Sequence, residues 1–313
     1  MHLRVHSQNF RGSVRKSLET IQNTFQPSDC ECTAFFLQDL GATGPDGPSL
    51  LKETLGDHSI YANSSQSNKS RTVAIILHKS WSITQVYRDT TGSLVGVVAS
   101  RSGIEILLIS AYLPSKTDIL GSPDLWDLDI KSPAKSVQEE IHAIYSSLLE
   151  WTTIHPLWLI GGDLNETRSQ VDRLRANDSA PKNLRKFING FLEDSNGIDV
   201  WRSLYPNTPG FTFKNNQGSS FSRIDYFLSS PSLTQLLEGI DMHLGNWAPD
   251  TKLDHVKLTF KGTFPVLPGE KNQGRPWSIP QPRLSHLTSA QKQECQQKVN
   301  LALLPLLHKA AFS

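Results

Sequence analysis

Polar residues suited to metal binding and proton transfer directly follow a short apolar segment. The stretch GGDLNETRSQ places Asp163, Asn165 and Glu166 immediately after residues 157–160, which are Leu, Trp, Leu and Ile. The two glycines at 161 and 162 predict a tight turn, so that the carboxylate and the carboxamide face outward from the edge of a sheet. Carboxylates at such a position can hold a divalent cation or accept a proton.

Other chemically active side chains end or begin apolar segments elsewhere in the chain. They are Asn9, Asp39, Tyr112, Asp225, Asp254 and His255. Strand ends are where a rigid sheet directs functional groups into a shared cleft. A single Asp or Asn at a strand end, however, is more often a turn residue or a cap than a catalyst.

Asp225 and His255 strengthen the case for function. Asp225 lies inside the apolar segment RIDYFL, and a buried carboxylate must find a partner or a metal. His255 alone would more often be a hydrogen-bonded structural histidine. Beside Asp254, and together with the other acidic and amide groups, it favours a functional site. The prediction therefore depends on the constellation and not on any single member.

Short apolar segments predict the strands that must position these residues. They span 3–5, 34–37, 73–77, 94–99, 104–112, 157–160, 211–213, 224–228 and 256–260. Helical periodicity is clearest at 137–149 and 184–192. Loops are predicted at 41–49 and 116–132, and a polar surface turn at 63–70. About nine strands with two or three helices predict an α/β class with two layered sheets faced by helices.

The composition changes after Phe260. Residues 262–282 are rich in Pro and Gly and predict a linker, and 288–291 have the form of a capping box that opens a helical pattern. We therefore predict one domain over 1–261, followed over 262–313 by a linker and the start of an amphipathic helix. The chain ends inside this pattern, as a fragment of a longer protein would.

Composition limits the classes of protein to consider. The 313 residues are 37% hydrophobic and 19% charged, which is typical of globular proteins. No apolar run approaches the ~20 residues of a membrane-spanning helix. The N-terminus does not resemble a signal peptide, and three cysteines cannot form a disulfide framework, so we expect a nuclear or cytoplasmic protein that is not secreted. Because the net charge is only +1, any polyanion must bind to a local basic patch.

Taken in order, the candidate residues resemble those of the endonuclease/exonuclease/phosphatase family, which includes AP endonucleases and the nuclease domains of non-LTR retrotransposons. The matching pieces are SQNFRG around Asn9, FFLQDL around Asp39, ISAYLPS around Tyr112, IGGDLNE around Asp163 and Asn165, SRIDYFLSS around Asp225, and LDHVKLTF around Asp254 and His255. The resemblance covers residues 1 to about 261. GDxN alone would be a weak signal, but its combination with the Asp225 and Asp-His pieces is specific.

The resemblance implies a DNase I-like fold, which is a four-layer α/β sandwich of two packed mixed β-sheets flanked by helices. It places the site at one edge of both sheets. Hydrolysis of a phosphodiester needs a divalent cation, an activated water and donors to the non-bridging oxygens. By the resemblance, Asp39 would hold Mg²⁺, or Mn²⁺ in its place, with Asn9 and Asp254 close by.

The resemblance also divides the catalytic work. Asp163 would position or deprotonate the attacking water, and Asn165 would donate a hydrogen bond to the phosphate. Asp225 would fix the tautomer of His255, whose other ring nitrogen would face the phosphate. Tyr112 would donate through its hydroxyl. Glu166 has a weaker case and is interpreted as a residue at a helix start.

Two positions depart from the family pattern. Asp39 stands where family members usually have Glu, so the shorter side chain would shift the metal or require a bridging water. Leu253 stands where a small Ser is usual, and we expect a packing adjustment there. These departures leave open a catalytically weakened member that acts as a DNA- or protein-binding module.

The substrate is predicted to be DNA, although the same fold also serves inositol-phosphate phosphatases and sphingomyelinases. The segment RIDYF at residues 223–227 favours a nucleic-acid substrate over a lipid or an inositol phosphate. Basic residues follow the Asp163 strand and could neutralise phosphates or form a solvated helix face: Arg168, Arg173, Arg175, Lys182, Arg185 and Lys186. Arg223 is a further candidate for substrate binding. The polar hairpin tip 214–222 could enter a groove or be an ordinary turn.

The C-terminal residues help to distinguish a retrotransposon nuclease domain from a stand-alone repair nuclease. Residues 275–288, followed by the helical pattern, look like the connector between a retrotransposon nuclease domain and a reverse transcriptase. A stand-alone AP endonuclease would need no such extension. The sequence therefore predicts a metal-dependent endonuclease that nicks duplex DNA, fused to a reverse transcriptase in a longer parent chain. An AP endonuclease or exonuclease of DNA repair is the alternative.

Overall fold

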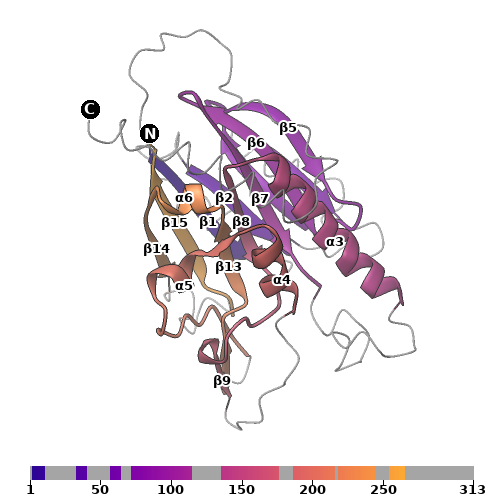
Figure 1. The fold of residues 1–313 in the computed structure, drawn as a ribbon, viewed down its shortest axis with the longest axis vertical. Coiled ribbons are helices and arrows are strands. Elements are labelled where there is room, and N and C mark those ends of the chain that lie inside the picture. The colour runs from indigo at the N-terminus through magenta and orange to yellow at the C-terminus, as the bar shows by residue number, and fades with distance from the viewer. Residues whose placement is uncertain are drawn as a thin grey trace.

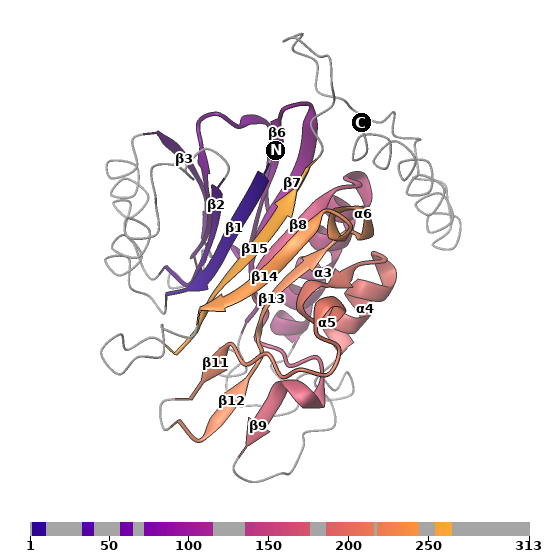
Figure 2. The same cartoon turned by 90° about the vertical axis from the view of Figure 1, so that its left-hand side faces the viewer.

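A computed structural model describes residues 2–10, 33–40, 57–64, 72–114, 135–175, 186–215, 218–243 and 254–264. Two six-stranded sheets pack face to face, and helices cover the outer face of one of them (Figures 1 and 2). This architecture confirms the predicted α/β sandwich. Among the described residues, no helix is long and apolar enough to cross a membrane.

The first sheet has the order β14-β15-β1-β2-β4-β3. Its strands are β1 (His2–Asn9), β2 (Thr33–Gln38), β3 (His58–Ser64), β4 (Thr72–His78), β14 (Leu237–His243) and β15 (Lys257–Thr263). β1 and β2 are parallel, and the other neighbours are antiparallel. Asn9 therefore ends a central strand of this sheet beside the end of β2, where Asn9 pairs with Gln38.

The second sheet has the order β10-β13-β8-β7-β6-β5. Its strands are β5 (Ser82–Arg88), β6 (Leu94–Arg101), β7 (Ile104–Tyr112), β8 (Trp158–Asp163), β10 (Ile198–Asp199) and β13 (Asp225–Ser229). β7 and β8 are parallel, so Tyr112 and Asp163 end neighbouring strands at the same edge. This repeats the arrangement of β1 and β2 in the first sheet.

The core between the sheets is built from the alternate side chains that face inward. Val5 and Ile75 from the first sheet and Val97 and Leu108 from the second are all fully buried. On the outer face of the second sheet, α3 (Lys135–Ile154) and α4 (Lys186–Asp194) form another core (Figure 1). Burial of apolar surface on both faces of this sheet makes it a rigid base for side chains at its edge.

Three short elements and a small third sheet complete the described residues. They are η2 (Gln170–Asp172), α5 (Val200–Leu204), α6 (Pro231–Thr234), and the strands β9 (Arg173–Arg175), β11 (Phe213–Lys214) and β12 (Ser220–Ser222). β12 pairs with both β9 and β11. Figure 2 shows this small sheet beyond the end of the sandwich.

The predicted strands coincide with strands of the two large sheets, except that 211–213 reaches only the first residue of β11. The periodicity missed β3, β5 and β14, whose side chains are mostly half-buried or exposed, so their sequences lack an apolar run. Residues 63 and 64 belong to β3 and not to the predicted surface turn. The predicted loops at 41–49 and 116–132 and the tail beyond 264 lie outside the described residues.

The end of the predicted domain can be compared directly. β15 continues to Thr263, two residues beyond the predicted boundary at 261, and Thr263 pairs with His2 at the other end of the domain sequence. The predicted linker and helix over 262–313 therefore begin within a strand, and their other residues are outside the described part apart from Phe264.

Candidate active site

Asp163 is the last residue of β8, and the two glycines before it allow close packing around the strand. A Cβ at Gly161 would lie 2.5 Å from Cε1 of Phe227 and 2.6 Å from Cδ2 of Phe36. A Cβ at Gly162 would lie 1.8 Å from the carbonyl oxygen of Ala111. The predicted turn is therefore wrong, because both glycines lie inside the strand. They allow the neighbouring strand and the facing sheet to approach β8 closely.

Asp225 is brought opposite Asp163 by strand register. β13 runs antiparallel to β8, and the two aspartates are direct partners across the pair. Both side chains are buried. The Oγ1 of Thr212 accepts hydrogen bonds from the backbone N–H groups of Ile224 and Asp225, which fixes the start of β13. Two carboxylates are thus held side by side away from water.

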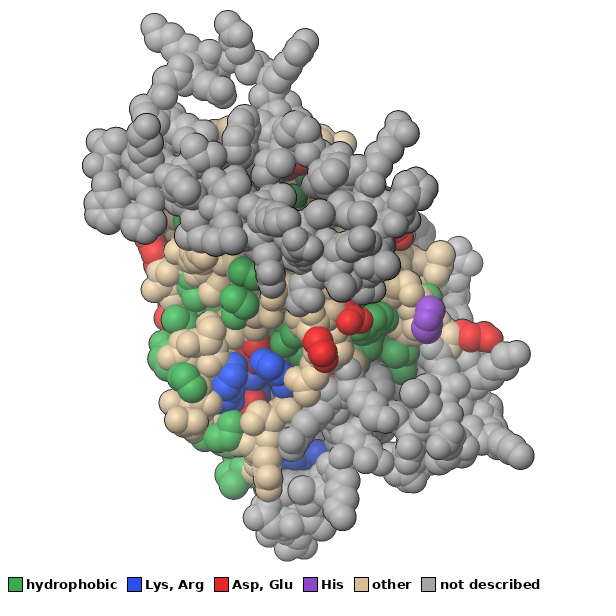
Figure 3. Space-filling model, in the orientation of Figure 1, with side chains coloured by type: hydrophobic (Ala, Val, Ile, Leu, Met, Phe, Trp, Pro, Cys, Tyr) green, Lys and Arg blue, Asp and Glu red, His purple; other side chains and the backbone are tan. Residues whose placement is uncertain are grey.

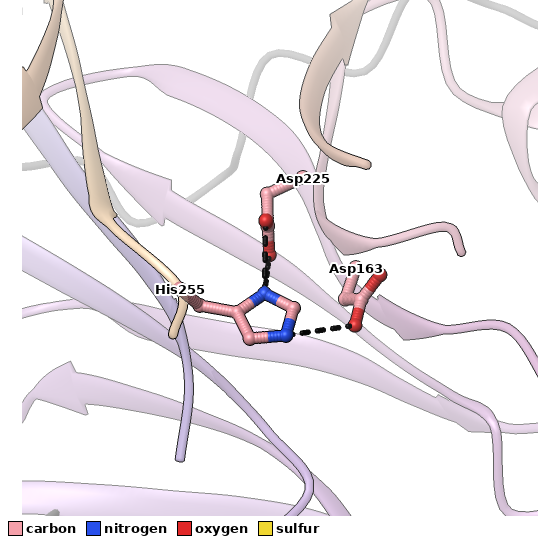
Figure 4. A group of neighbouring side chains, drawn as sticks. All are labelled: Asp163, Asp225 and His255. Atoms are coloured by element: carbon pink, nitrogen blue, oxygen red, sulfur yellow. Dashed lines mark hydrogen bonds and ion pairs between the residues drawn. The ribbon is translucent and has the colours of Figure 1, made fainter. Parts of the chain in front are cut away.

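His255 lies between these carboxylates (Figure 4). Its Nδ1 donates to Asp225, at 3.1 Å from Oδ1 and 3.0 Å from Oδ2, and its Nε2 is 3.8 Å from Oδ2 of Asp163. Phe213 packs against the imidazole, with ring centroids 5.0 Å apart. The predicted pairing of Asp225 with one nitrogen of His255 is present in this geometry.

The charge of this cluster perturbs its protonation. Burial and the Asp225 carboxylate raise the pKa of Asp163 from 3.8 to about 7, against the opposing effect of His255. Burial alone would lower the pKa of His255, but Asp225, Asp163 and Asp254 together raise it from 6.5 to about 9. Near neutral pH, His255 is therefore an imidazolium and Asp163 is close to its titration midpoint.

Two asparagines orient the Asp163 carboxylate. Nδ2 of Asn9 donates to Oδ2 at 2.8 Å, and the backbone N–H of Asn165 donates to Oδ1 at 2.9 Å. Nδ2 of Asn165 donates to the carbonyl oxygen of Leu113 at 2.7 Å. Asn165 has a φ of 49°, a left-handed conformation that Asn adopts more readily than most residues. Asn9 comes from the first sheet, so these contacts join both sheets at one carboxylate.

The predicted metal ligands lie at the same edge of the first sheet. Asp39 directly follows β2, Asn9 ends β1, and Asp254 precedes β15, which pairs with β1. Asp39 has a φ of 49°, which an aspartate tolerates, and its side chain is half-buried, whereas Asn9 and Asp254 are buried. Leu253 is outside the described residues.

A second possible set of metal ligands consists of residues predicted to be catalytic. Asp163, Asp225 and His255 each offer a ligand atom, and these atoms all lie within 4.8 Å of one another. The sequence had assigned metal binding to Asp39, Asn9 and Asp254 alone. These three side chains are close enough together to share a cation only when His255 is neutral, because an imidazolium has no lone pair for a metal.

Tyr112 and Glu166 border the cluster differently. Tyr112 is paired with Asp163 in the β7–β8 register and packs in the core between the sheets. Glu166 is 2% exposed, and its Oε2 accepts from the backbone N–H of Ile188 in the first turn of α4. No helix begins at Glu166, so its interpretation as a helix-start residue is wrong, although its carboxylate contacts the N-terminus of a different helix, where negative charge is favourable.

The predicted substrate-binding arginines fall into two groups. Arg223 is 1% exposed and forms ion pairs with Asp172 and Asp199, so the prediction that it binds substrate is corrected to a buried structural contact. Arg168 is partly exposed, and it pairs with Asp199. Arg173 and Arg175 lie on β9 of the small sheet. Of the other basic residues, Lys186 begins α4, and Lys182 and Arg185 are outside the described part.

Acidic partners of these arginines were missed by the sequence analysis. Asp172 and Asp199 are almost fully buried, and Arg202 also pairs with Asp172. Figure 3 shows Lys and Arg side chains gathered with Asp and Glu side chains on this face, between the α5 and β9 regions of Figure 1. The sequence did contain an indication that these two aspartates are buried. Asp172 and Asp199 each follow an apolar β-branched residue, as Asp225 does.

The comparison with known protein families finds no family model that matches the chain. Solved structures resemble it at low identity. A 3′ phosphatase, NExo from Neisseria, bound to a product DNA hairpin, has a TM-score of 0.65 and 16% identity, over 84% of this chain and 100% of that chain. AP endonuclease LMAP from Leishmania major has a TM-score of 0.62 and 14% identity, over 84% and 88% of the two chains.

The endonuclease domain of TRAS1, a telomere-specific non-LTR retrotransposon, is also similar. Its TM-score is 0.56 at 15% identity, over 84% of this chain and 98% of that chain. All of these proteins share the endonuclease/exonuclease/phosphatase fold, and this chain has that fold too. The predicted resemblance is thereby confirmed for the architecture.

Proposed function

We propose that this protein is a metal-dependent endonuclease that hydrolyses phosphodiester bonds in duplex DNA. The observation that carries the proposal is the buried imidazole of His255 with one carboxylate at each of its nitrogens. Asp225 holds one nitrogen, and Asp163 lies 3.8 Å from the other. Asp163 as a base and His255 as a cationic donor thus lie next to each other. In-line attack of water on a phosphate needs both groups close to the reacting phosphate.

The donors fit a hard divalent cation. Asp39, Asn9 and Asp254 offer oxygen ligands at the edge of the first sheet, as Mg²⁺ or Mn²⁺ prefers. Burial and, after it, the Asp225 carboxylate raise the pKa of Asp163, and a nearby cation would favour the ionised carboxylate. When bound, the cation would neutralise charge on the phosphate and on the leaving oxygen.

The protein's own groups supply the remaining chemistry. Asp163, held by Asn9 and by the Asn165 backbone, positions the attacking water and accepts its proton. A pKa of about 7 suits this task, because a general base works best when its pKa is near the working pH. The side-chain amide of Asn165 and the hydroxyl of Tyr112 donate to the phosphate.

His255 acts as the charged donor. Asp225 keeps Nδ1 protonated and raises the pKa of the ring, so Nε2 also carries a proton near neutral pH. That proton is donated to a non-bridging oxygen, where negative charge increases in the transition state. Such a contact lowers the barrier more than it strengthens ground-state binding.

Several observations support DNA as the substrate. NExo is described with a product DNA hairpin, LMAP as an AP endonuclease, and TRAS1 as a retrotransposon endonuclease domain. Arg173 lies on β9 of the small sheet beyond the end of the sandwich, and a basic residue there would contact the phosphate backbone of DNA. We also propose the retrotransposon type, with a reverse transcriptase in the same parent chain and a nuclear or cytoplasmic location.

A substrate panel tests this proposal. Supercoiled plasmid, a matched abasic duplex and phospholipid vesicles are incubated with the protein and Mg²⁺ at equal phosphate concentration. We expect plasmid nicking that stops in excess EDTA. If the abasic duplex is cut more than about a hundredfold faster, a gap of roughly 2.7 kcal/mol, the protein is an AP endonuclease. Binding of plasmid without any nicking would indicate a binding module.

A further inference from the structure

A buried network of charged and hydroxyl groups joins the two segments that carry the candidate catalytic carboxylates. One segment runs from Asp163 to Asp172, and the other begins at Arg223 and enters β13. We propose that Arg223 and Tyr226 are positioning residues that fix these segments relative to each other, an inference that rests on the proposed function. Neither residue touches the reacting atoms.

Arg223 holds two acidic side chains from distant parts of the chain. Its Nη1 and Nη2 donate to the two carboxylate oxygens of Asp199, at 2.8 and 2.7 Å, and Nη2 also donates to Asp172 at 2.8 Å. Its backbone N–H donates to the carbonyl oxygen of Asp172 at 2.9 Å. Arg223 therefore fixes η2 and β10 two residues before Asp225.

Tyr226 makes the complementary contacts from inside β13. Its hydroxyl lies 2.9 Å from the carbonyl oxygen of Glu166 and 3.0 Å from that of Arg223, and it accepts from the backbone N–H of Arg168 at 3.0 Å. The Arg223 guanidinium lies over the Tyr226 ring, 4.4 Å from its centroid. Every contact of this hydroxyl is to one of the two segments that carry the candidate site.

The network remains ionised because each of its two buried carboxylates is paired with two guanidinium groups. Burial would raise the pKa of Asp199, but Arg223, the Arg202 backbone and Arg168 lower it below its ordinary value. A bidentate ion pair between buried partners holds a fixed geometry. This arrangement attaches the segment that follows β8 to the start of β13.

The consequence for the site follows from the chain path. Leu164 donates its backbone N–H to the carbonyl oxygen of Ile224 at 2.8 Å, so the two segments are in contact beside both carboxylates. A small displacement of the Glu166–Arg168 backbone would be passed to Asn165 and Asp163. Displacements of about 1 Å in a catalytic group can cost on the order of a hundredfold in rate.

The test removes the Tyr226 hydroxyl and, as a control in a second variant, the hydroxyl of another tyrosine in the same sheet. Tyr226→Phe deletes the positioning contacts, whereas Tyr87→Phe deletes a contact of similar length, 2.9 Å to Nε2 of His155, on the edge strand β5. In plasmid nicking, we expect Tyr226→Phe to lower kcat by about 10- to 100-fold with KM within about twofold. Tyr87→Phe is expected to keep both values.

A conservative variant provides the rescue. Arg223→Lys retains one charge but not the two-pronged contact, so we expect it to recover part of the kcat that Arg223→Met loses. Equal loss of kcat in Tyr226→Phe and Tyr87→Phe, or full kcat in Tyr226→Phe, would overturn the inference.

Amide hydrogen exchange separates this inference from the proposed function. Tyr226→Phe should speed exchange at Leu164 and Arg168, whereas Tyr87→Phe should not. If the wild type cleaves no phosphodiester, the proposed function fails, and the exchange result still decides the coupling. Unchanged exchange at both amides would overturn it.

Discussion

Two buried charged clusters lie on either side of the start of β13, and they differ in charge balance. The acid-rich cluster consists of Asp163, Asp225 and His255, with two carboxylates around one imidazole. The charge-balanced cluster consists of Arg223, Asp172 and Asp199, together with Arg168 and Arg202 at its border. Both are built by the same short stretch, because Arg223 and Asp225 are two residues apart.

The difference shows how a structural ion network can be told from a candidate site. In the charge-balanced cluster, the guanidinium groups outweigh burial and lower the pKa of Asp199. In the acid-rich cluster, burial and a second carboxylate raise the pKa of Asp163 to about 7. The raised pKa of Asp163 means that its ionised form is destabilised by the fold, which is typical of groups retained for chemistry, whereas removal of one partner from the first cluster would leave a buried charge unpaired.

The largest effect is expected from breaking the charge-balanced cluster. Arg223→Met leaves Asp172 and Asp199 short of a buried partner and should lower the free energy of unfolding by about 3–5 kcal/mol. Urea unfolding measures the change. Lys261→Met removes an exposed pair with Asp241 at 2.6 Å and should cost about 0–1 kcal/mol. Similar losses in the two variants would contradict the comparison.

Next comes the donor of the acid-rich cluster. His255→Ala should lower kcat for plasmid nicking by about 10²–10³-fold, because its contact strengthens as charge develops on the phosphate. DNA affinity, measured without divalent cations, should change much less. His78→Ala, a histidine remote from the cluster in the first sheet, serves as the control. A change in affinity alone would reassign His255 to substrate positioning.

The protonation of His255 tests the electrostatics directly. In EDTA, NMR titration should give a pKa of about 9 for His255, and Asp225→Asn should lower that pKa because the paired carboxylate is lost. Stability from this protonation is fully present below pH 6.5 and is lost as pH rises through about 9. The Asp225→Asn variant should lose it at lower pH. An unchanged pKa would exclude Asp225 as the cause.

The smallest effect concerns Glu166, which lies three residues after Asp163 in the sequence. Burial raises its pKa from 4.5 to about 7, so its contribution to stability is present below pH 4.5 and is lost as pH rises through about 7. Glu166→Gln keeps an acceptor for Ile188 and removes the charge. The variant should gain about 1–3 kcal/mol relative to wild type between pH 4.5 and pH 8. If the stability difference between the variant and wild type does not change with pH across that range, burial does not raise the pKa of Glu166.

The sequence predicted the central strands of both sheets for a physical reason. Apolar runs such as those of β4 and β7 are buried on both faces, so they remain visible without any tertiary information. The need of a buried carboxylate for a partner or a metal marked Asp225, and the family resemblance implied that this partner is His255. The edge strands β3 and β5 were not predicted, because their side chains are partly exposed and their sequences therefore lack an apolar run.

What sequence could not predict depends on packing between distant segments. Gly161 and Gly162 suggested a turn, yet the space is taken by Phe36, Phe227 and the β7 backbone. Arg223 looked like a phosphate contact because its partners lie 51 and 24 residues away along the chain. An arginine beside a catalytic strand has the same sequence signature whether it faces DNA or a buried acid.

The most direct test is the single-turnover rate of plasmid nicking by Asp163→Asn beside wild type, in Mg²⁺. This change removes the proposed base but keeps the volume of the side chain, so DNA binding should be retained. We expect the rate to fall by about 10²–10⁴-fold, the usual contribution of a general base. A variant that nicks plasmid at more than about a tenth of the wild-type rate would contradict the assignment of Asp163 as the base.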